Sequence, residues 1–364
     1  MRKLLAALAA AVVTLATAPA ALAAEVPSDF YGVVTQGGLG PDDAPLMQEA
    51  NVGTLRFHFD WRTVQGQPGD CQASAEVGIC DWRTFDLGIG MLAASGVQSF
   101  PFLLNVPWFV DEDSNVPPIR SKQDREAWTG FLTAVVKRYG PGGEYWRLYY
   151  PAQFPGATPL PVTHWEVWNE PSDGSYWQPK PNPEEYARLL EISGRAIHRA
   201  DQRTDVVFAG LFGTPTEDND GIKAFNFYRR AFARPGIGRY FDDVGVHPYG
   251  PTMKRVQTQM GWVREEMAAA GFQDRDIWIT EIAWSSSDPP TILGVGPEGQ
   301  AQLLTESFKY FAKRRREWNI AGLHWYSWQD LPGPGLCEFC EKSGLVSFDR
   351  QPKPSYYAFQ RAAK

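Results

Sequence analysis

The sequence predicts an α/β protein whose single large domain is a (β/α)8 TIM barrel. About eight short apolar runs, rich in β-branched and aromatic residues, recur along the 364-residue chain, with helical patterns between them. The runs are hydrophobic almost throughout, as expected for parallel strands that are covered on both faces. No internal repeat and no domain linker interrupts the series. One chain with this pattern favours eight βα units closed into a barrel.

The predicted strands can be placed in chain order. They are residues 31–35, 54–61, 99–105, 163–169, 206–212, 243–247, 277–282 and 323–328. Apolar side chains at helical spacing predict helices between them, over 186–197, 256–267 and 304–315. Asn182, followed by Pro183 and two glutamates, is typical of a helix start. The longest irregular stretch, residues 140–161, is expected on the N-terminal side of the barrel or along its flank.

A doubly wound open sheet is the structural alternative. It usually carries a glycine-rich phosphate loop after its first strand. Residues 36–40 are glycine-rich but lack the G-x-G-x-x-G order. The barrel therefore remains the favoured fold.

The first residues are typical of an export signal. Arg2 and Lys3 precede an apolar run, and Ala21-Leu22-Ala23 offers a small-x-small cleavage site. We therefore expect a signal peptide over 1–23, a catalytic barrel over 24–364 and a secreted protein. A membrane anchor is the alternative, but the run is short for a span, and no later stretch is long and apolar enough to cross a bilayer.

The four cysteines agree with export. Of their three possible connectivities, local pairing of Cys71 with Cys80 and of Cys337 with Cys340 is favoured by their spacing. No second C-x-x-C and no neighbouring histidine pair completes a zinc site. The five histidines show no H-E-x-x-H and no clustered spacing, so we expect no catalytic metal and no other cofactor.

The composition indicates which kinds of molecule this protein could bind. The 35 basic and 42 acidic residues give a net charge of −7, which argues against a nucleic-acid binder. Hydrophobic residues at 43% and charged residues at 21% are ordinary for a globular protein. Aromatic residues make up 13%, including 14 tryptophans, and such rings can line a surface that binds sugar faces.

Two glutamates lie at the ends of predicted strands, where barrels carry their chemistry. Glu170 follows the fourth strand and Glu281 lies in the seventh. Strands four and seven face each other across a barrel, so the two carboxyl groups can converge. Such a pair is what glycoside hydrolysis requires: one protonated acid for the leaving oxygen, one carboxylate for the anomeric carbon.

The motifs around these glutamates resemble those of clan A glycoside hydrolases, which are barrel enzymes that retain anomeric configuration. Trp165-Glu166-Val167-Trp168-Asn169-Glu170-Pro171 resembles their strand-four signature, and Trp278-Ile279-Thr280-Glu281 their nucleophile segment. The stretch from Trp165 into the helix at Tyr186 is most similar to family 39, with family 5 second. This resemblance implies that Glu170 is the general acid/base and Glu281 the nucleophile.

The resemblance extends, less sharply, to the expected sugar site. It implies that Arg56 keeps the nucleophile ionised, that His247 bonds the sugar or the acid/base, and that Tyr249 bonds the nucleophile. Asn169 can bond the sugar 2-hydroxyl. Trp325 or Trp328 is expected to form a floor under the sugar, although the pattern does not fix the register of the last strand. The third strand departs from family 5, which often has a histidine there, whereas this chain reads Leu104-Asn105-Val106-Pro107-Trp108.

Other polar and aromatic residues have less specific interpretations. Trp108 follows a strand end and can stack on a sugar. Glu166 is interpreted as a buried partner of an arginine. His58 could face the cleft or satisfy polar groups of the core, and the core interpretation is favoured. Either strand-end glutamate, taken alone, could instead cap a helix or pair with an arginine.

The sequence therefore predicts a secreted retaining glycosidase that binds an oligosaccharide or polysaccharide and neither nucleic acid nor, after signal cleavage, a membrane. A non-catalytic sugar-binding barrel and a transglycosylase that uses the same residues remain the alternatives. Family 39-like barrels act on several sugars, so the substrate stays open.

Overall fold

The computed structural model describes residues 26–75, 78–213, 221–287, 291–333, 337 and 339–364. The predicted signal peptide lies outside the described residues. Within the described part of the chain, no helix combines the length and the apolar character that a bilayer crossing needs.

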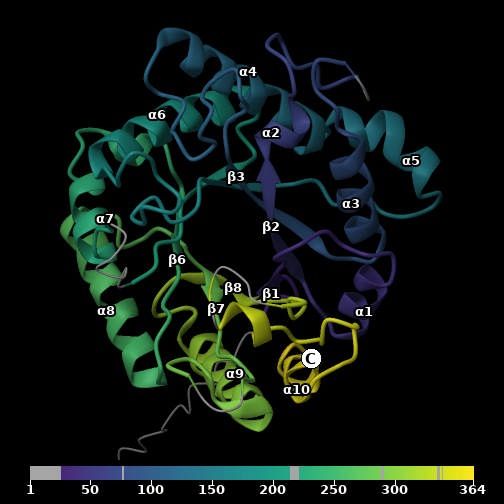
Figure 1. Cartoon of the computed structure of the whole chain (residues 1–364), viewed down its shortest axis with the longest axis vertical. Coiled ribbons are helices and arrows are strands. Elements are labelled where there is room, and N and C mark those ends of the chain that lie inside the picture. The colour runs from purple at the N-terminus through teal and green to yellow at the C-terminus, as the bar shows by residue number, and fades with distance from the viewer. Residues whose placement is uncertain (1–25, 76–77, 214–220, 288–290, 334–336, 338) are drawn as a thin grey trace, which may run out of the picture.

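Eight parallel strands form a closed barrel in which sequence neighbours pair and the first strand pairs with the last (Figure 1). This confirms the predicted fold. The strands are β1 (Tyr31–Val34), β2 (Thr54–Asp60), β3 (Gln98–Leu104), β4 (His164–Val167), β5 (Asp205–Phe208), β6 (Asp243–Val246), β7 (Ile277–Ile282) and β8 (Ile320–Tyr326). Each overlaps its predicted range, but β4 and β5 end earlier and β8 begins earlier than predicted.

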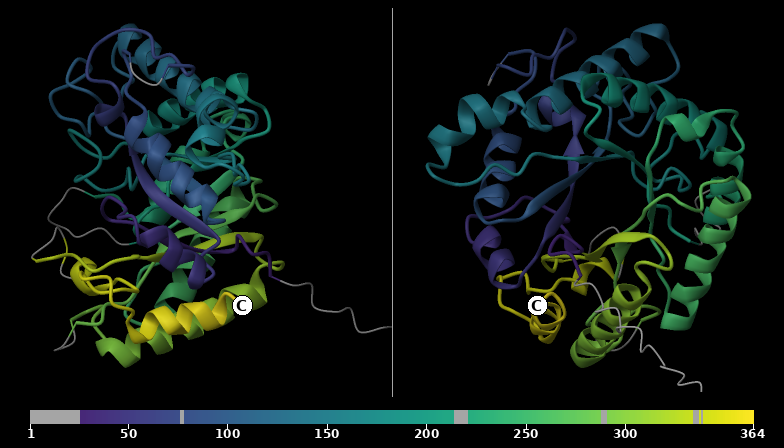
Figure 2. Two further views of the ribbon diagram at one scale, coloured as in Figure 1. Left: turned by 90° about the vertical axis from the view of Figure 1, so that its right-hand side faces the viewer. Right: turned by 180° about the vertical axis from the view of Figure 1, so that it is seen from behind.

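Helices surround the barrel (Figures 1 and 2). They are α1 (Asp43–Glu49), α2 (Trp61–Val64), α3 (Arg83–Ala94), α4 (Lys122–Tyr139), α5 (Tyr150–Gln153), α6 (Pro183–Ala200), α7 (Ala224–Phe232), α8 (Met253–Ala269), α9 (Gly296–Arg314) and α10 (Pro354–Ala362). The Asn182 side chain accepts hydrogen bonds from the backbone N–H groups of Glu184 and Glu185, which confirms the predicted start of α6.

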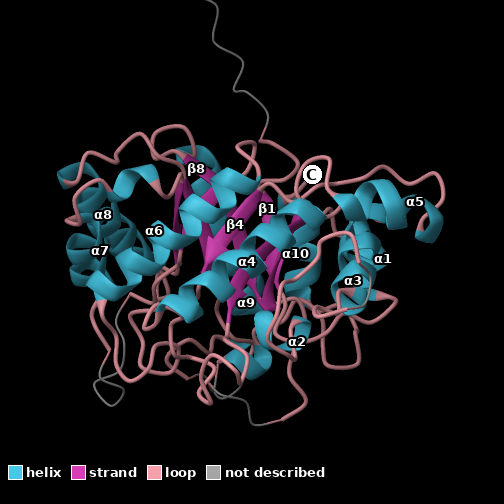
Figure 3. Cartoon of the chain, turned by 90° about the horizontal axis from the view of Figure 1, so that it is seen from above, coloured by secondary structure: helices cyan, strands magenta, loops and turns pink. Residues whose placement is uncertain are grey.

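The stretch 140–161 is less irregular than predicted. It contains a π-helical segment, Tyr145–Tyr149, which runs directly into α5. Tyr145, Trp146 and Tyr150 are buried, and their rings pack on one another. The Tyr145 hydroxyl donates to the carbonyl of Asp86 in α3 at 2.6 Å. The segment lies at the edge of the molecule beside α3, in agreement with the expected flank position (Figure 3).

Two apolar layers hold the barrel. Between strands and helices lies one large cluster, in which outward-facing strand residues pack on helix side chains. Inside the barrel, Phe100, Val207 and Trp278 form a smaller cluster nearer the strand starts. The long loops gather on the side where the strands end (Figure 3). That end, here called the mouth, carries the candidate site.

Both local disulfides are present, Cys71–Cys80 in the loop after β2 and Cys337–Cys340 in the loop after β8. The favoured pairing of the four cysteines is therefore confirmed.

Candidate active site

Glu170 and Glu281 meet at the mouth from opposite sides of the barrel. Glu281 lies in β7 and is 8% exposed. Glu170 follows the end of β4, and its backbone N–H donates to the carbonyl of Gly210 after β5. Carboxylate oxygens of the two residues, together with a ring nitrogen of His247, lie within 4.8 Å of one another.

The chain near Glu170 has an unusual backbone. Trp168 and Glu170 have φ angles of 77° and 42°, a region that side-chain-bearing residues rarely adopt. The ring nitrogen of Trp168 donates to the Tyr176 carbonyl at 2.7 Å, and the Asp173 N–H donates to the Glu170 carbonyl at 2.8 Å. These contacts fix a sharp turn, and strained conformations of this kind concentrate at functional sites.

Arg56 in β2 connects the acidic groups of the site. Its guanidinium is fully buried and donates to Glu281 Oε1 at 2.7 Å, to Glu166 at 2.6 and 3.1 Å, and to Asn169 Oδ1 at 2.8 Å. Burial lowers the pKa of Arg56, but the charges of Glu166 and Glu281 outweigh this effect and raise it above the ordinary value. The interpretation of Glu166 as a buried arginine partner is confirmed.

Glu281 has two firm hydrogen-bond donors. Oε1 accepts from Arg56, and Oε2 accepts from the Tyr249 hydroxyl at 2.8 Å. Burial raises the pKa of Glu281 above its ordinary value, and Arg56 and the Tyr249 hydrogen bond oppose this rise. Each of these two donors stabilises the carboxylate form.

Glu170 has the opposite environment. Burial and the nearby charges of Asp173 and Glu166 raise its pKa to about 8, and Arg56 opposes them only in part. At neutral pH the protonated form of Glu170 therefore predominates. The surroundings of the two carboxyl groups therefore differ: Glu281 accepts hydrogen bonds from Arg56 and Tyr249, whereas the charges of Asp173 and Glu166 favour a protonated Glu170.

His247 lies between the two acids. Its Nδ1 is 2.7 Å from Glu170 Oε1 and 3.7 Å from Glu281 Oε2. Burial lowers the pKa of His247 to about 4, so the ring is neutral at pH 7 and its contact with Glu170 is a hydrogen bond. Its Nε2 is buried without a hydrogen-bond partner among the described residues.

Two groups of side chains could in principle hold a metal ion. One is Glu170, His247 and Glu281, and the other, at the strand starts, is His164, Asp205 and Asp243. In the first group both oxygens of Glu281 already accept from Arg56 and Tyr249.

Trp325 and Trp328 pack against the helices around the barrel and do not form the expected sugar floor. Both are almost fully buried, at 0% and 1% exposure. Trp325 packs against Phe308 of α9, and the Trp328 ring nitrogen donates to Asp43 of α1 at 3.0 Å. Side chains alternate along a strand, so the outward position of Trp325 turns Tyr326 toward the inside.

Tyr326 takes the place expected for a tryptophan. Burial and the charges of Glu281 and Glu170 raise its pKa. Its ring centroid lies 6.4 Å from that of Tyr249, whose hydroxyl donates to Glu281. The Tyr326 hydroxyl donates to Gln36 Oε1 at 2.9 Å. Tyr326 has the same strand parity as His324, whose ring packs inside the barrel, but the sequence does not show which face of this strand enters the barrel.

His58 lies in β2 and is half-buried. It shares the strand parity of Arg56, stacks on Phe102 with ring centroids 5.2 Å apart, and interacts with Asp60 and Asn105. Burial lowers its pKa, and its Nε2 is buried without a partner among the described residues. Trp108, in contrast, is 67% exposed beyond β3, and its ring nitrogen donates to the Gly66 carbonyl.

Three solved structures of glycosidases have folds similar to that of this chain. A family 39 glycoside hydrolase from Bacteroides cellulosilyticus WH2 matches with a TM-score of 0.62 and 19% identity, covering 94% of this chain and 64% of that one. A monomeric β-xylosidase from Caulobacter crescentus CB15 matches with a TM-score of 0.60 and 20% identity, covering 91% and 67%. A glucosidase from Croceicoccus marinus matches with a TM-score of 0.65 and 16% identity, covering 92% and 67%.

The fold is that of family 39 glycoside hydrolases. The sequence itself matches no protein-family model and no curated protein. The chain spans about two thirds of the length of the three solved structures. Within this family 39-like fold, Glu170 and Glu281 occupy the mouth, where barrel enzymes place their reacting groups.

Proposed function

We propose that this protein is a secreted retaining glycoside hydrolase that cleaves β-linked sugars. The observation that carries the proposal is the pair Glu170 and Glu281, whose carboxylate oxygens lie within 4.8 Å at the mouth. Retaining enzymes place the two carboxyl groups about 5–5.5 Å apart, whereas inverting enzymes separate them by roughly 6.5–9.5 Å to admit a water. The short separation supports double displacement.

In the proposed mechanism Glu281 attacks the anomeric carbon and Glu170 protonates the leaving oxygen. The glycosidic bond breaks as the bond between the sugar and Glu281 forms. Glu170, now a carboxylate, takes a proton from water, whose oxygen then displaces Glu281 from the sugar. Arg56 and Tyr249 stabilise Glu281 when it is ionised, and His247 orients Glu170 through Nδ1.

Asn169 and Trp108 are proposed sugar contacts. Because Asn169 Oδ1 accepts from Arg56, its amide NH2 group is the donor end that remains for a sugar hydroxyl. The exposed Trp108 ring offers an apolar face for stacking. The xylosidase and the glucosidase with similar folds make β-xylosides and β-glucosides the first substrates to try. The apolar N-terminus and the two disulfides support secretion.

The test is hydrolysis of a panel of aryl β-glycosides and β-linked polysaccharides by wild type, Glu281→Gln and Glu170→Gln. Glu265→Gln, which changes an exposed glutamate on α8, is the matched control. We expect Glu281→Gln to abolish turnover. Glu170→Gln should lose activity mainly on substrates with poor leaving groups, and added azide should restore turnover as a β-glycosyl azide. Turnover that survives Glu281→Gln would contradict the assignment.

The same panel separates the alternatives. Sugar binding by all three proteins without turnover would indicate a non-catalytic barrel. Glycosyl transfer to an added sugar, in preference to water, would indicate a transglycosylase.

A further inference from the structure

The Tyr249 ring packs among several other rings. Its hydroxyl can hold Glu281 only while the ring keeps its place. The ring centroids of Phe339 and Phe212 lie 5.2 and 5.5 Å away, and that of Tyr326 lies 6.4 Å away. The Phe339 ring is thus among the rings nearest to Tyr249, although Phe339 lies about ninety positions further along the chain.

Phe339 comes from the turn that the Cys337–Cys340 disulfide closes. The N–H of Cys340 donates to the carbonyl of Cys337 at 3.1 Å, so a hydrogen bond and a covalent bond both join the ends of the turn. A bridge across so few residues leaves Phe339 little freedom to swing away from Tyr249.

Gln36, in the loop after β1, joins this turn to the barrel. Its Nε2 donates to the carbonyl of Cys340 at 2.9 Å and to Ser327 Oγ at 2.8 Å. Its Oε1 accepts from the Tyr326 hydroxyl. One amide therefore sets the position of the disulfide turn relative to Tyr326, the other aromatic residue that flanks Tyr249.

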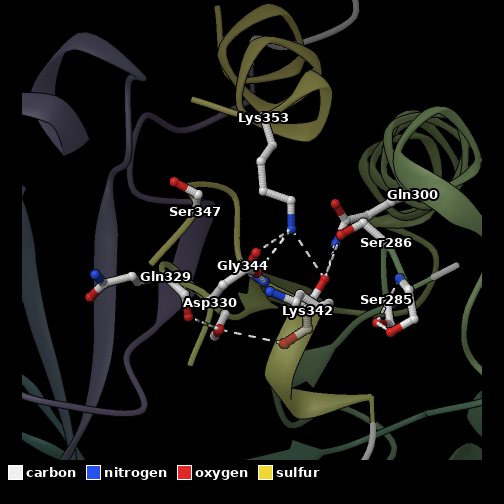
Figure 4. Close-up of polar contacts among 12 residues, drawn as sticks. Ser285, Ser286, Gln300, Gln329, Asp330, Lys342, Gly344, Ser347 and Lys353 are labelled. Carbon is white, nitrogen blue, oxygen red and sulfur yellow. Dashed lines mark hydrogen bonds and ion pairs between the residues drawn. The ribbon is translucent and has the colours of Figure 1, made fainter. Parts of the chain in front are cut away.

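The chain beyond the turn is also fastened (Figure 4). Lys353 Nζ lies 2.9 Å from Asp330 Oδ1, and both side chains are largely buried. The Lys342 carbonyl accepts from Lys353 at 3.1 Å, from the Ser286 N–H at 2.9 Å and from Gln300 at 3.2 Å. This network ties the end of the turn to the loop after β7, the strand that carries Glu281.

We propose that Phe339, fixed by the Cys337–Cys340 disulfide, is a positioning residue that keeps the Tyr249 hydroxyl on Glu281. The disulfide turn thereby becomes part of the catalytic apparatus and not only a stabilising bridge. The inference rests on the proposed function, because it concerns the group assigned as the nucleophile.

The test is a double-mutant cycle of Phe339→Ala and Tyr249→Phe, measured by kcat, KM and the pH profile. Tyr249→Phe removes a hydrogen bond to a charged group and should lower kcat by roughly 10- to 100-fold. Phe339→Ala should lower kcat by about tenfold with little change in KM, because a displaced hydroxyl loses most of its effect. In the Tyr249→Phe background the further loss should shrink to less than about twofold, because the two residues act as one unit.

Three matched variants accompany the cycle. Cys337→Ser with Cys340→Ser should reproduce the kcat loss of Phe339→Ala. Phe339→Leu, which keeps an apolar side chain, should recover part of the activity. Phe348→Ala, which removes an exposed ring from the same inter-element segment, should change neither kcat nor KM. Thermal unfolding of each variant shows whether it is folded at the assay temperature.

A second readout does not depend on turnover. In protein labelled with carboxyl-13C glutamate, the resonance absent from Glu281→Gln identifies Glu281. Phe339→Ala and Tyr249→Phe should each raise its apparent pKa, since the hydroxyl stabilises the charged form, and together they should raise it no further. Independent, multiplying losses of kcat or an unchanged pKa in Phe339→Ala would overturn the inference. If the two variants shift the Glu281 pKa as expected but the wild type hydrolyses no glycoside, the result would count against the proposed function alone.

Discussion

At the scale of single residues, Arg56 links the parts of the site that come from three strands. It bonds Glu166 from β4, Asn169 just after β4 and Glu281 from β7, and its guanidinium lies 4.2 Å from the Phe102 ring of β3. The planar fork of arginine suits this arrangement, because one group can serve several carboxyl and amide oxygens in fixed directions. Lysine could not make these contacts together.

Replacement of Arg56 by methionine should therefore damage stability as well as activity. It leaves Glu166 buried without its counterion, and removal of one partner of such a pair costs about 3–5 kcal/mol. We expect a loss of this size in the free energy of unfolding, measured by urea denaturation. The double variant Glu166→Gln, Arg56→Met should recover part of the lost free energy of unfolding. A loss below ~1 kcal/mol for Arg56→Met would contradict the structural role.

Asp173 provides a residue-scale test of the acid assigned to Glu170. The general acid acts in its protonated form, so kcat/KM should fall as pH rises through the Glu170 pKa of about 8. The Asp173 charge helps to raise that pKa. Asp173→Asn keeps an oxygen for the Ser175 N–H and should move the alkaline limb of the pH–rate profile to lower pH. An unmoved alkaline limb would indicate that a group other than Glu170 controls it. Glu265→Gln is the control variant and should leave the pH–rate profile unchanged.

At the scale of elements, the sequence predicts where a helix begins better than it predicts which face of a buried strand enters the barrel. Asn182 and Pro183 announce the start of α6 because capping depends on a few neighbouring residues. The face of β8 that enters the barrel cannot be predicted in this way. Leu323, His324 and Trp325 are all fully buried, and a strand buried on both faces shows no polar alternation. This is why Trp325 was expected at the mouth and Tyr326 was missed.

The cap of α6 allows a direct test at this scale. Asn182→Ala removes the acceptor for two N–H groups of the first turn and should lower the free energy of unfolding by about 1 kcal/mol. Asn182→Ser should lose much less, because serine can also accept these bonds. Chemical denaturation of the three proteins gives the comparison, and equal losses for alanine and serine would show that the cap is not the cause.

At the scale of the whole molecule, closure of the barrel creates a second charged cluster, at the strand starts. Asp243 lies there with Asp205, Asp242, Asp276 and His164 around it. Burial, followed by the charges of the neighbouring aspartates, raises the pKa of Asp243 to about 8. Burial lowers the pKa of His164 to about 4, so this ring offers little compensating charge near neutral pH.

Stability should depend on this cluster in a defined direction. The folded state holds a proton on Asp243 up to a pKa of about 8, whereas the unfolded chain releases it near pH 4. The folded state binds more protons between these values, so Asp243 lowers stability as pH rises through that window. Asp243→Asn should flatten the decline, by at most about 1.4 kcal/mol per pH unit. Urea denaturation between pH 5 and 8 measures it, and an unchanged slope would contradict the raised pKa.

The sequence by itself determined the alternation of strands and helices, the local disulfides, the cap of α6 and the two glutamates at strand ends. These features depend on periodicity, on short spacings, or on residue types that indicate a functional site when they lie at the end of a barrel strand. The Arg56–Glu166 pair was within reach as well, since a buried carboxylate demands a partner.

Only the tertiary structure decided which side chains face one another across the mouth. The raised pKa values of Glu170 and Glu281 depend on burial and on charged groups that come from separate strands. The contact of Phe339 with Tyr249 depends on how the loop after β8 folds back over the barrel. Such contacts join residues far apart in the chain, and no local pattern encodes their distance or orientation.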